Sequence, residues 1–332
     1  MKQYFPEYYR SFSCIAGACP DSCCKEWTVD VDDTSAAYYR SLDGALGDRL
    51  RAVLQDTEDG TVMEIEDGRC PMWRQDGLCR IHTELGHDAL CKTCREFPRL
   101  RHDYGDFVEL GLELSCPEAA RLILASEGNM LCEDVAGGEE PEYDAEVMQI
   151  LKASQQQALA VLESYPLPQA LAIILLYAHD VQAQIDGEEA LDFQPDALLD
   201  EAKKYVGTAD VAGIFRFFAG LELLTEDWAK MLANAPVQIR WSKPLMRYLI
   251  GRYWLQAVSD FDLICRVKFM VTACILVGSL EGDFARAAQL FSKEVENDPD
   301  NVEAVLDGAY RSPALTDVNL FSILLGKNAI FP

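Results

Sequence analysis

The segment Phe12-Ser-Cys14-Ile-Ala-Gly-Ala-Cys19-Pro-Asp-Ser-Cys23-Cys24 begins a cysteine-rich stretch of the chain. The stretch continues through Cys70-Pro-Met-Trp73 and Leu78-Cys79-Arg-Ile-His82, and it ends with Cys91-Lys-Thr-Cys94-Arg95-Glu-Phe-Pro98-Arg99. Thiolate is a soft ligand that selects zinc, Cu(I) or iron–sulfur clusters, and cysteines in loops can converge on one centre. The spacing therefore predicts a metal-binding region with these candidate ligands: Cys14, Cys19, Cys23, Cys24, Cys70, Cys79, Cys91 and Cys94.

Chain length and the absence of targeting signals indicate how these cysteines are used. With 332 residues, 49% of them hydrophobic, the chain is long enough to bury an apolar core without cross-links. Its first residues, MKQYFPEYYR, lack the apolar run of a secretory signal. The longest run without Asp, Glu, Lys or Arg, Ser164 to His179, is shorter than the roughly 20 residues that a bilayer requires. We therefore expect a cytoplasmic protein, in which clustered thiols serve metal binding or catalysis.

The charge of the chain restricts its partners. There are 55 Asp and Glu residues against 29 Lys and Arg residues, which gives a net charge of −26. Such a field repels phosphate backbones and anionic membrane surfaces, so we expect no nucleic acid and no membrane among the partners. The same field favours a cationic partner such as a lysine-bearing protein, although plain solubility of an acidic surface is the simpler explanation.

The distribution of cysteine predicts two domains. Ten of the twelve cysteines lie between Cys14 and Cys132, and only Cys265 and Cys274 follow. The acidic, glycine-containing stretch 133–142 has no apolar periodicity and carries loop signals. We therefore place a boundary at Gly138, with a cysteine-rich metal domain over 1–138 and a second domain over 139–332.

Apolar periodicity predicts a mainly α protein. In the first domain, short turns separate two helices (33–54 and 117–127) and two small strands (28–31 and 61–66). The second domain shows helical spacing nearly throughout, which predicts an all-α bundle behind an irregular cysteine-rich domain. Its expected helices cover residues 142–164, 168–184, 195–205, 210–232, 243–259, 263–280, 284–296 and 302–307.

The sequence leaves the metal and its ligands open. There is neither a pair of zinc-ribbon knuckles nor a ferredoxin run of C-x2-C-x2-C. Cys23 and Cys24 are neighbours whose side chains point apart, so both rarely bind one metal atom. His82 either completes a mixed zinc site or is an ordinary hydrogen-bonded histidine. Cys116 is a possible further ligand, whereas Cys132, Cys265 and Cys274 fit a structural role.

Basic residues on apolar helices form a second group of candidates. Arg247 and Arg252 lie on one such helix, and Arg266 and Lys268 lie on the next. Buried charges need partners, and the acidic residues available nearby in the sequence are Asp260, Asp262, Glu294 and Glu296. These residues form either a structural ion-pair network or a pocket between helices, with aromatic faces from Tyr248, Tyr253 and Trp254.

Several separated segments resemble one family. Phe12-x-Cys14 through Cys23-Cys24 and Trp27, Gly77-Leu-Cys79-Arg-Ile-His82, and Cys94-Arg-Glu-Phe-Pro98-Arg99 resemble the YkgJ-type zinc- or iron-chelating region of the flagellin lysine N-methylase (FliB) family. Leu114-Ser-Cys116-Pro-Glu-Ala-Ala-Arg121, Arg247-Tyr248, Arg252-Tyr253 and Phe291-Ser-Lys-Glu294-Val-Glu296 are similar to its later segments. The resemblance thus extends over nearly the whole chain.

The resemblance implies an activity. It implies a protein lysine N-methyltransferase that uses S-adenosylmethionine, holds a Cys-ligated [4Fe–4S] cluster or, alternatively, zinc, and acts on flagellin or another surface protein. Within the similar helices we expect Arg252, Glu294 and Tyr253 to be catalytic, and Arg247 and Lys268 to bind the donor. The chain lacks a C-x3-C-x2-C triplet and a glycine-rich donor motif. The alternative is a non-catalytic zinc- or iron-binding protein that acts in docking or maturation.

Overall fold

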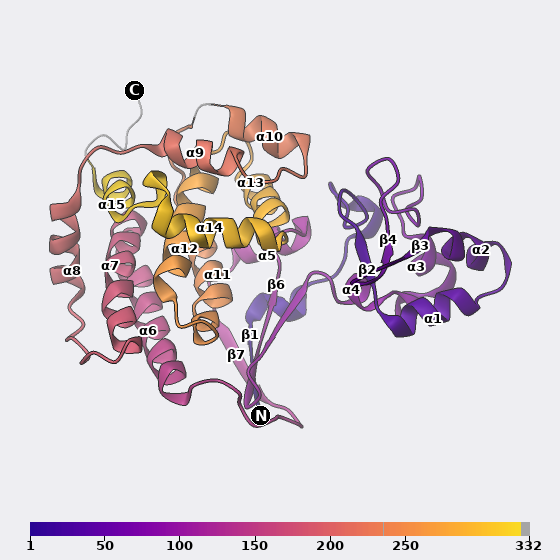
Figure 1. The fold of residues 1–332 in the computed structure, drawn as a ribbon, viewed down its shortest axis with the longest axis horizontal. Coiled ribbons are helices and arrows are strands. Elements are labelled where there is room, and N and C mark those ends of the chain that lie inside the picture. Colours follow the sequence, from indigo (N-terminus) through magenta and orange to yellow (C-terminus); the bar gives the residue numbers. More distant parts are fainter. Residues whose placement is uncertain (235, 327–332) are drawn as a thin grey trace.

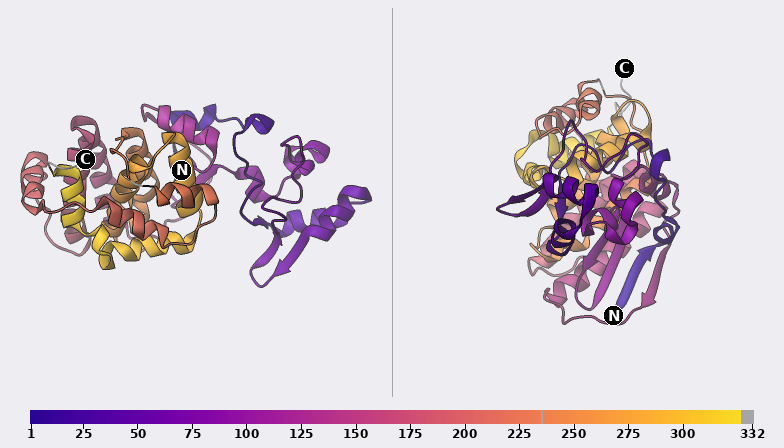
Figure 2. Two further views of the ribbon diagram at one scale, coloured as in Figure 1. Left: turned by 90° about the horizontal axis from the view of Figure 1, so that it is seen from above. Right: turned by 90° about the vertical axis from the view of Figure 1, so that its right-hand side faces the viewer.

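The computed structural model describes residues 1–234 and 236–326. Most of these residues are helical, which confirms the predicted fold class (Figure 1). Figure 1 and the left view of Figure 2 show a smaller part that projects from one end of a larger helical part. We call residues 13–98 the cysteine lobe and the remainder the helical body. Within the described residues, no helix is both long enough and apolar enough to cross a membrane.

The cysteine lobe combines short helices with a small antiparallel sheet of strand order β2-β4-β3. Its elements are β2 (Val29–Val31), α1 (Asp33–Ser41), α2 (Gly44–Val53), β3 (Leu54–Thr57), β4 (Gly60–Met63), α3 (Arg80–Leu85) and α4 (Lys92–Glu96). The single helix expected over 33–54 is in fact two. The backbone of Leu42 is extended and ends α1, and the φ of +79° at Gly44, the first residue of α2, breaks the helical path between the two helices. The fully buried Tyr39 and Met72 mark the core of the lobe.

A four-stranded sheet, which the sequence analysis did not predict, lies at the edge of the helical body. Its strands are β1 (Lys2–Pro6), β5 (Arg99–Asp103), β6 (Phe107–Leu112) and β7 (Met130–Asp134), in the order β5-β6-β1-β7. Strands β1 and β6 are parallel, and the other pairs are antiparallel. His102 on β5 pairs directly with Glu109 on β6, so the two side chains lie on the same face of the sheet.

The remaining helices include α12, whose residues are buried on nearly all sides. They are α5 (Pro117–Ala125), α6 (Ala145–Ser164), α7 (Leu167–Ile185), α8 (Pro195–Ala202), α9 (Val211–Ala219), α10 (Glu226–Ala233), α11 (Lys243–Tyr253), α12 (Leu263–Ser279), α13 (Phe284–Phe291), α14 (Pro299–Arg311) and α15 (Asp317–Leu325). The helix expected over 210–232 is split, because Thr225 caps a new helix after a break at Gly220. A π-helical turn, η6 (Ser292–Glu296), extends α13.

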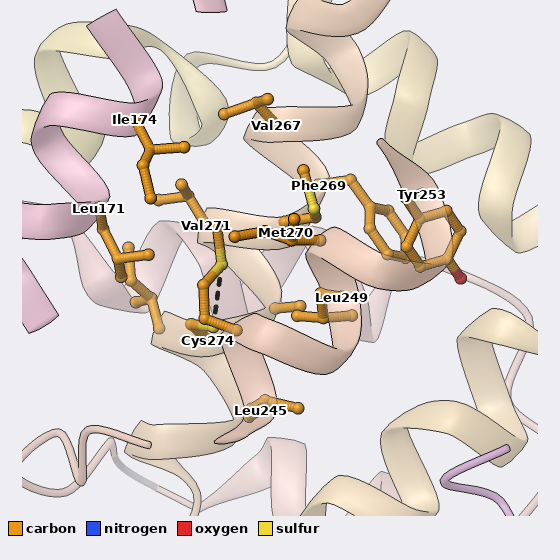
Figure 3. Close-up of a cluster of buried hydrophobic side chains, with 14 of the residues drawn as sticks. Leu171, Ile174, Leu245, Leu249, Tyr253, Val267, Phe269, Met270, Val271 and Cys274 are labelled. Carbon is orange, nitrogen blue, oxygen red and sulfur yellow. Dashed lines mark hydrogen bonds between the residues drawn. The ribbon is translucent and has the colours of Figure 1, made fainter. Parts of the chain in front are cut away.

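The core of the helical body lies between α7, α11 and α12 (Figure 3). Cys274 lies within it, and its sulfur is 3.9 Å from the sulfur of Met246. The ring of Tyr253 lies 4.8 Å from that of Phe269, and Figure 3 shows its hydroxyl directed away from the apolar side chains. Tyr253 therefore contributes its ring to the core and keeps its hydroxyl for a polar partner.

Two apolar clusters show which segments pack together. The larger one includes Phe12, Phe107 and Leu114 together with helices that follow α6, so it takes residues from both sides of Gly138. The smaller one is confined to residues 24–94 of the cysteine lobe. Gly138 itself lies in the loop between β7 and α6, and a domain boundary there stays a prediction.

Candidate functional site

Backbone contacts bring several predicted metal ligands together in the cysteine lobe. The amide of Cys70 donates a hydrogen bond to the carbonyl oxygen of Cys24 at 2.8 Å, and Trp73 pairs with Cys79 in an isolated β-bridge. Cys79 and Cys91 each precede the first residue of a short helix, α3 and α4. The small apolar cluster contains all of these cysteines together with Cys94. Thiols that lie far apart in the sequence are thus neighbours.

The thiols also change one another's proton affinity. The thiol of Cys24 interacts with those of Cys23, Cys70 and Cys79, and these three neighbours raise its pKa. The same interaction with Cys24, aided by backbone amides of α3, lowers the pKa of Cys79 to about 6. Cys94 lowers the pKa of Cys91 in the same way. Thiolate is the form that binds metal, so the lowered pKa values favour ligation by Cys79 and Cys91, whereas the pKa values of Cys24 and Cys94 are raised.

The donor chemistry fits a thiolate-ligated centre. Among residues 1–234 and 236–326, however, no group of three or more Cys, His, Asp or Glu side chains surrounds a point that would hold a single ion. Cys14 is exposed and Cys19 half-buried, and both lie near Cys116 rather than in the apolar cluster.

The π-helical turn η6 touches the cysteine lobe through a buried ammonium group. Lys293 lies 2.7 Å from Glu26 and 3.6 Å from Asp21, and its nitrogen is 4.8 Å from the centre of the Trp27 ring. Its side chain is only 1% exposed. Burial alone would raise the pKa of Asp21, but Lys293 and Arg286 hold it at about 2. Ion pairs of Lys293 with Asp21 and Glu26 therefore hold the segment that carries Cys19, Cys23 and Cys24 against the helical body.

The same turn, η6, also supplies the carboxylate of Glu296, which binds polar side chains of α11. Glu296 accepts hydrogen bonds from the hydroxyls of Tyr248 at 3.1 Å and Tyr253 at 2.9 Å, and it lies 3.5 Å from Arg252. Arg252 also donates to the Tyr248 hydroxyl at 2.7 Å. The side chain of Glu296 is fully buried. Of the four acidic partners considered in the sequence, Glu296 is thus the one that neutralises Arg252.

The structure separates the other predicted site residues. Glu294 points away from Arg252 and accepts hydrogen bonds from the amide of Leu224 and the hydroxyl of Thr225. Lys268 forms an ion pair with Asp317 at 2.9 Å, on the side of α12 that faces α15. Arg247 lies 2.6 Å from Glu163 and, like Arg252, belongs to α11. The structure therefore brings Arg252 and Tyr253 together at Glu296, and it leaves Arg247, Glu294 and Lys268 outside this network.

A cavity of about 570 Å³ lies between the sheet and helices α6 and α11. Its volume is in the range of sites for small molecules and cofactors. Arg247 and Arg252 both reach its wall, whereas Tyr253, Glu294 and Lys268 do not. Aromatic and aliphatic side chains form much of the lining, including Tyr4, Tyr8, Leu100, Phe107, Leu112, Leu159, Tyr248 and Leu255.

Three titratable residues of this cavity were missed by the sequence analysis. Burial raises the pKa of Glu109 to about 7, against the opposing effect of Lys152. Burial also lowers the pKa of Lys152, whose nitrogen lies 3.6 Å from the centre of the Phe107 ring. Burial, and then the charge of Arg252, lowers the pKa of His102 to about 4. One signal was available, because Glu109 interrupts the apolar run Phe107-Val-Glu-Leu-Gly-Leu112.

Glu109 gives the folded protein a testable pH dependence. Its folded-state pKa of about 7 exceeds the ordinary value of 4.5, so the folded state holds a proton that the unfolded chain releases. This contribution to stability is complete below pH 4.5 and is lost as the pH rises through 7. We therefore expect Glu109→Gln to be more stable than the wild type at pH 8, by about 3 kcal/mol, and equally stable at pH 4.

Urea unfolding of both proteins at pH 4, 6 and 8 measures this difference. Glu133→Gln is the matched control, because Glu133 lies on β7 of the same sheet but pairs with Arg10 in an exposed ion pair. Its stability is expected to follow the wild-type pH dependence. If the free energies of unfolding of Glu109→Gln and the wild type depend on pH in the same way, the pKa of Glu109 is the same in the folded and the unfolded chain, and the expected shift is wrong.

Known proteins resemble part of this chain. The flagellar biosynthetic protein FliU of Salmonella muenchen is 36% identical over 129 residues, which make up 36% of this chain and 75% of FliU. Proteins named lysine-N-methylase from Salmonella choleraesuis and Salmonella typhimurium are 35% and 34% identical over 126 and 129 residues. These two matches cover 36% of this chain but only 31% of each methylase. No family model and no solved structure matches the chain.

Proposed function

Because this chain belongs to the flagellin lysine N-methylase (FliB) family, we propose that it transfers methyl groups to lysine side chains of a protein. The observation that carries the proposal is its 36% identity over three quarters of FliU, together with the similarity to two lysine-N-methylases. The expected donor is S-adenosylmethionine, and the expected acceptors are flagellin or another surface protein.

The cavity between the sheet and α11 has the features that methyl transfer needs. A lysine amine must lose its proton before it attacks a sulfonium, and aromatic faces stabilise the cationic donor and product. Tyr4, Tyr8 and Tyr248 provide such faces, and the cavity is otherwise mainly apolar. Arg247, which packs against Gly128 at the cavity wall, is the residue suited to a donor carboxylate.

The cysteine lobe is the proposed place of a [4Fe–4S] cluster, with zinc as the alternative. Cys24, Cys70, Cys79, Cys91 and Cys94 would supply the thiolates, because they share the apolar cluster of the lobe. When bound, an iron–sulfur cluster supplies a site for one-electron transfer and holds together the loops that carry its ligands.

The π-helical turn η6 gives the two proposed sites a common support. Lys293 contacts the segment of Cys23 and Cys24, and Glu296 holds Arg252 at the wall of the cavity. π-helical turns occur frequently at functional sites. This arrangement supports a protein in which the metal lobe and the cavity act together.

The test uses the full chain purified without oxygen. We expect binding of S-adenosylmethionine by calorimetry, and transfer of labelled methyl groups to lysines of a co-expressed acceptor, with flagellin tried first. Mass spectrometry of the acceptor locates the modified residues. If the metal-replete protein binds no donor and labels no lysine, methyl transfer is wrong, and the docking or maturation module becomes the better interpretation.

A further inference from the structure

We infer that Glu109 accepts the proton from a substrate lysine whose side chain enters the cavity between the sheet and helices α6 and α11. This inference rests on the proposed methyl transfer and assigns a residue to its proton step. It names a group that the resemblance to the family does not supply.

The geometry at Glu109 sets it apart from the other acids of the cavity. Its Oε2 atom is buried and has no hydrogen-bond partner among the described residues. Glu163 is paired with Arg247 and is half-exposed, and it therefore already has a counter-ion. A buried carboxylate oxygen without a partner, next to open volume, is a free acceptor.

The alternative proton acceptors are weaker. His102 faces Glu109 across the strand pair, but its pKa of about 4 makes it a poor base at neutral pH. The carboxylate of Glu296 is engaged by Arg252 and by the hydroxyls of Tyr248 and Tyr253. Burial raises the pKa of the Tyr8 phenol, so it keeps its own proton. Glu109 is the one acid of this group with both a free oxygen and a pKa close to neutrality.

Lys152 is the positioning residue for this acceptor. Its ammonium lies over the face of Phe107, which shows that the cavity wall accommodates a lysine cation against an aromatic ring. Its charge opposes the effect of burial on Glu109 and keeps part of the carboxyl ionised near pH 7. Besides Glu109, the charged and titratable residues of the cavity lining are Tyr4, Tyr8, His102, Glu127, Lys152, Glu163, Arg247, Tyr248 and Arg252, and Tyr104 also interacts with Glu109.

The proposed step balances with a sulfonium methyl donor. The substrate ammonium gives one proton to the carboxylate of Glu109, which becomes a neutral acid. The amine lone pair then forms a nitrogen–carbon bond to the donor methyl group. The sulfur–carbon bond breaks and its electrons stay on sulfur, so the donor leaves as a neutral thioether and the product is a methylammonium ion.

The rim of the cavity favours a lysine substrate. Glu127 and Asn129 are exposed residues of its lining, and Glu163 is half-exposed at the same opening. Arg247 neutralises Glu163, so the attraction for a basic segment comes from Glu127 and from the strongly acidic chain as a whole. The substrate is therefore a lysine in a flexible segment that can insert its four-carbon side chain.

The test compares Glu109→Gln with the wild type as full-length, metal-replete protein. We expect donor binding to be unchanged and methyl transfer at pH 7.5 to fall about 100-fold or more, because a proton acceptor has been lost. The residual rate of the variant is expected to rise about tenfold per pH unit towards the pKa of free lysine, near 10. Glu133→Gln, from the same sheet but outside the cavity, is expected to retain wild-type activity.

A second variant tests the arrangement without removing the acceptor. Lys152→Met removes the charge that opposes burial, so the acidic limb of the pH–rate profile is expected to move to higher pH, whereas Lys152→Arg restores it. If the wild type methylates lysine and Glu109→Gln keeps its rate and pH profile, the role of Glu109 is refuted while methyl transfer stands. If the wild type itself transfers no methyl group to lysine, the proposed function is wrong, and the role of Glu109 is refuted together with it.

Discussion

Replacing Glu296 with alanine is expected to lower the free energy of unfolding of the helical body by about 3–5 kcal/mol. Glu296 is the buried carboxylate that faces the guanidinium of Arg252 and two tyrosine hydroxyls. Its removal leaves Arg252 charged without this counter-ion, because a guanidinium keeps its proton in proteins. The cost is the desolvation of an unpaired charge, which far exceeds the loss of one exposed ion pair.

Urea unfolding followed by circular dichroism measures this loss. Glu303→Ala is the matched control, because Glu303 is exposed on α14, and its effect is expected to stay within about 0.5 kcal/mol. The double variant Arg252→Met with Glu296→Leu removes both charges and is expected to recover most of the stability. A loss below about 1 kcal/mol in Glu296→Ala would mean that water reaches Arg252 and that the network is not closed.

The sequence could not show whether Glu294 or Glu296 is the partner of Arg252. Both residues lie in one predicted helix, and both were possible partners for the arginines of α11. The π-helical turn η6 adds a residue to one turn and so rotates the residues that follow. Glu296 consequently faces Arg252, whereas Glu294 faces Thr225. No local pattern in Ser292-Lys-Glu-Val-Glu296 distinguishes this turn from an ordinary α-helix.

The four-stranded sheet is the second feature that the sequence did not predict. Helical periodicity predicted most helices of the body, because a buried face repeats every three or four residues within one segment. Strand β1, by contrast, pairs in parallel with β6, and Lys2 lies beside Phe107. The edge strand β7 is largely exposed and shows no alternation. The cavity depends on this long-range pairing, so His102, Glu109 and Lys152 could not be grouped from their positions in the sequence.

The cysteines were the most informative local signal. Their spacing predicted a lobe organised by thiols, and the structure places those of residues 24–94 in one small cluster. The sequence could not show which of these cysteines lie close enough together to bind one metal centre. Cys14 is exposed and Cys19 lies near Cys116, whereas the exposed Cys23 contacts the thiol of Cys24, so position along the chain alone did not separate the inner thiols from the outer ones.

Replacing Cys24 or Cys79 with serine is expected to remove most of the bound metal and to unfold the cysteine lobe. The two thiols interact directly, and the pKa of Cys79 is already lowered to about 6 by that contact. Serine is a poor ligand, and loss of a thiolate-bound metal removes on the order of 10 kcal/mol of binding free energy that organises the lobe. The helical body has its own apolar cluster and is expected to keep its helical signal.

Metal and sulfide content per chain, together with limited proteolysis of residues 13–98, measure the outcome. Cys274→Ala is the matched control, because its buried thiol packs against Met246 in the helical body and its loss is expected to cost only about 1 kcal/mol. Iron with comparable acid-labile sulfide in the wild type would agree with a [4Fe–4S] cluster, whereas zinc without sulfide would replace that assignment. A soluble Cys79→Ser variant with a full complement of metal would remove Cys79 from the ligands.

The variant Cys14→Ser tests whether the metal centre includes the exposed segment before Cys23. If this variant keeps its metal, the ligands lie among the cysteines of residues 24–94. If it loses its metal, the ligands also include Cys14.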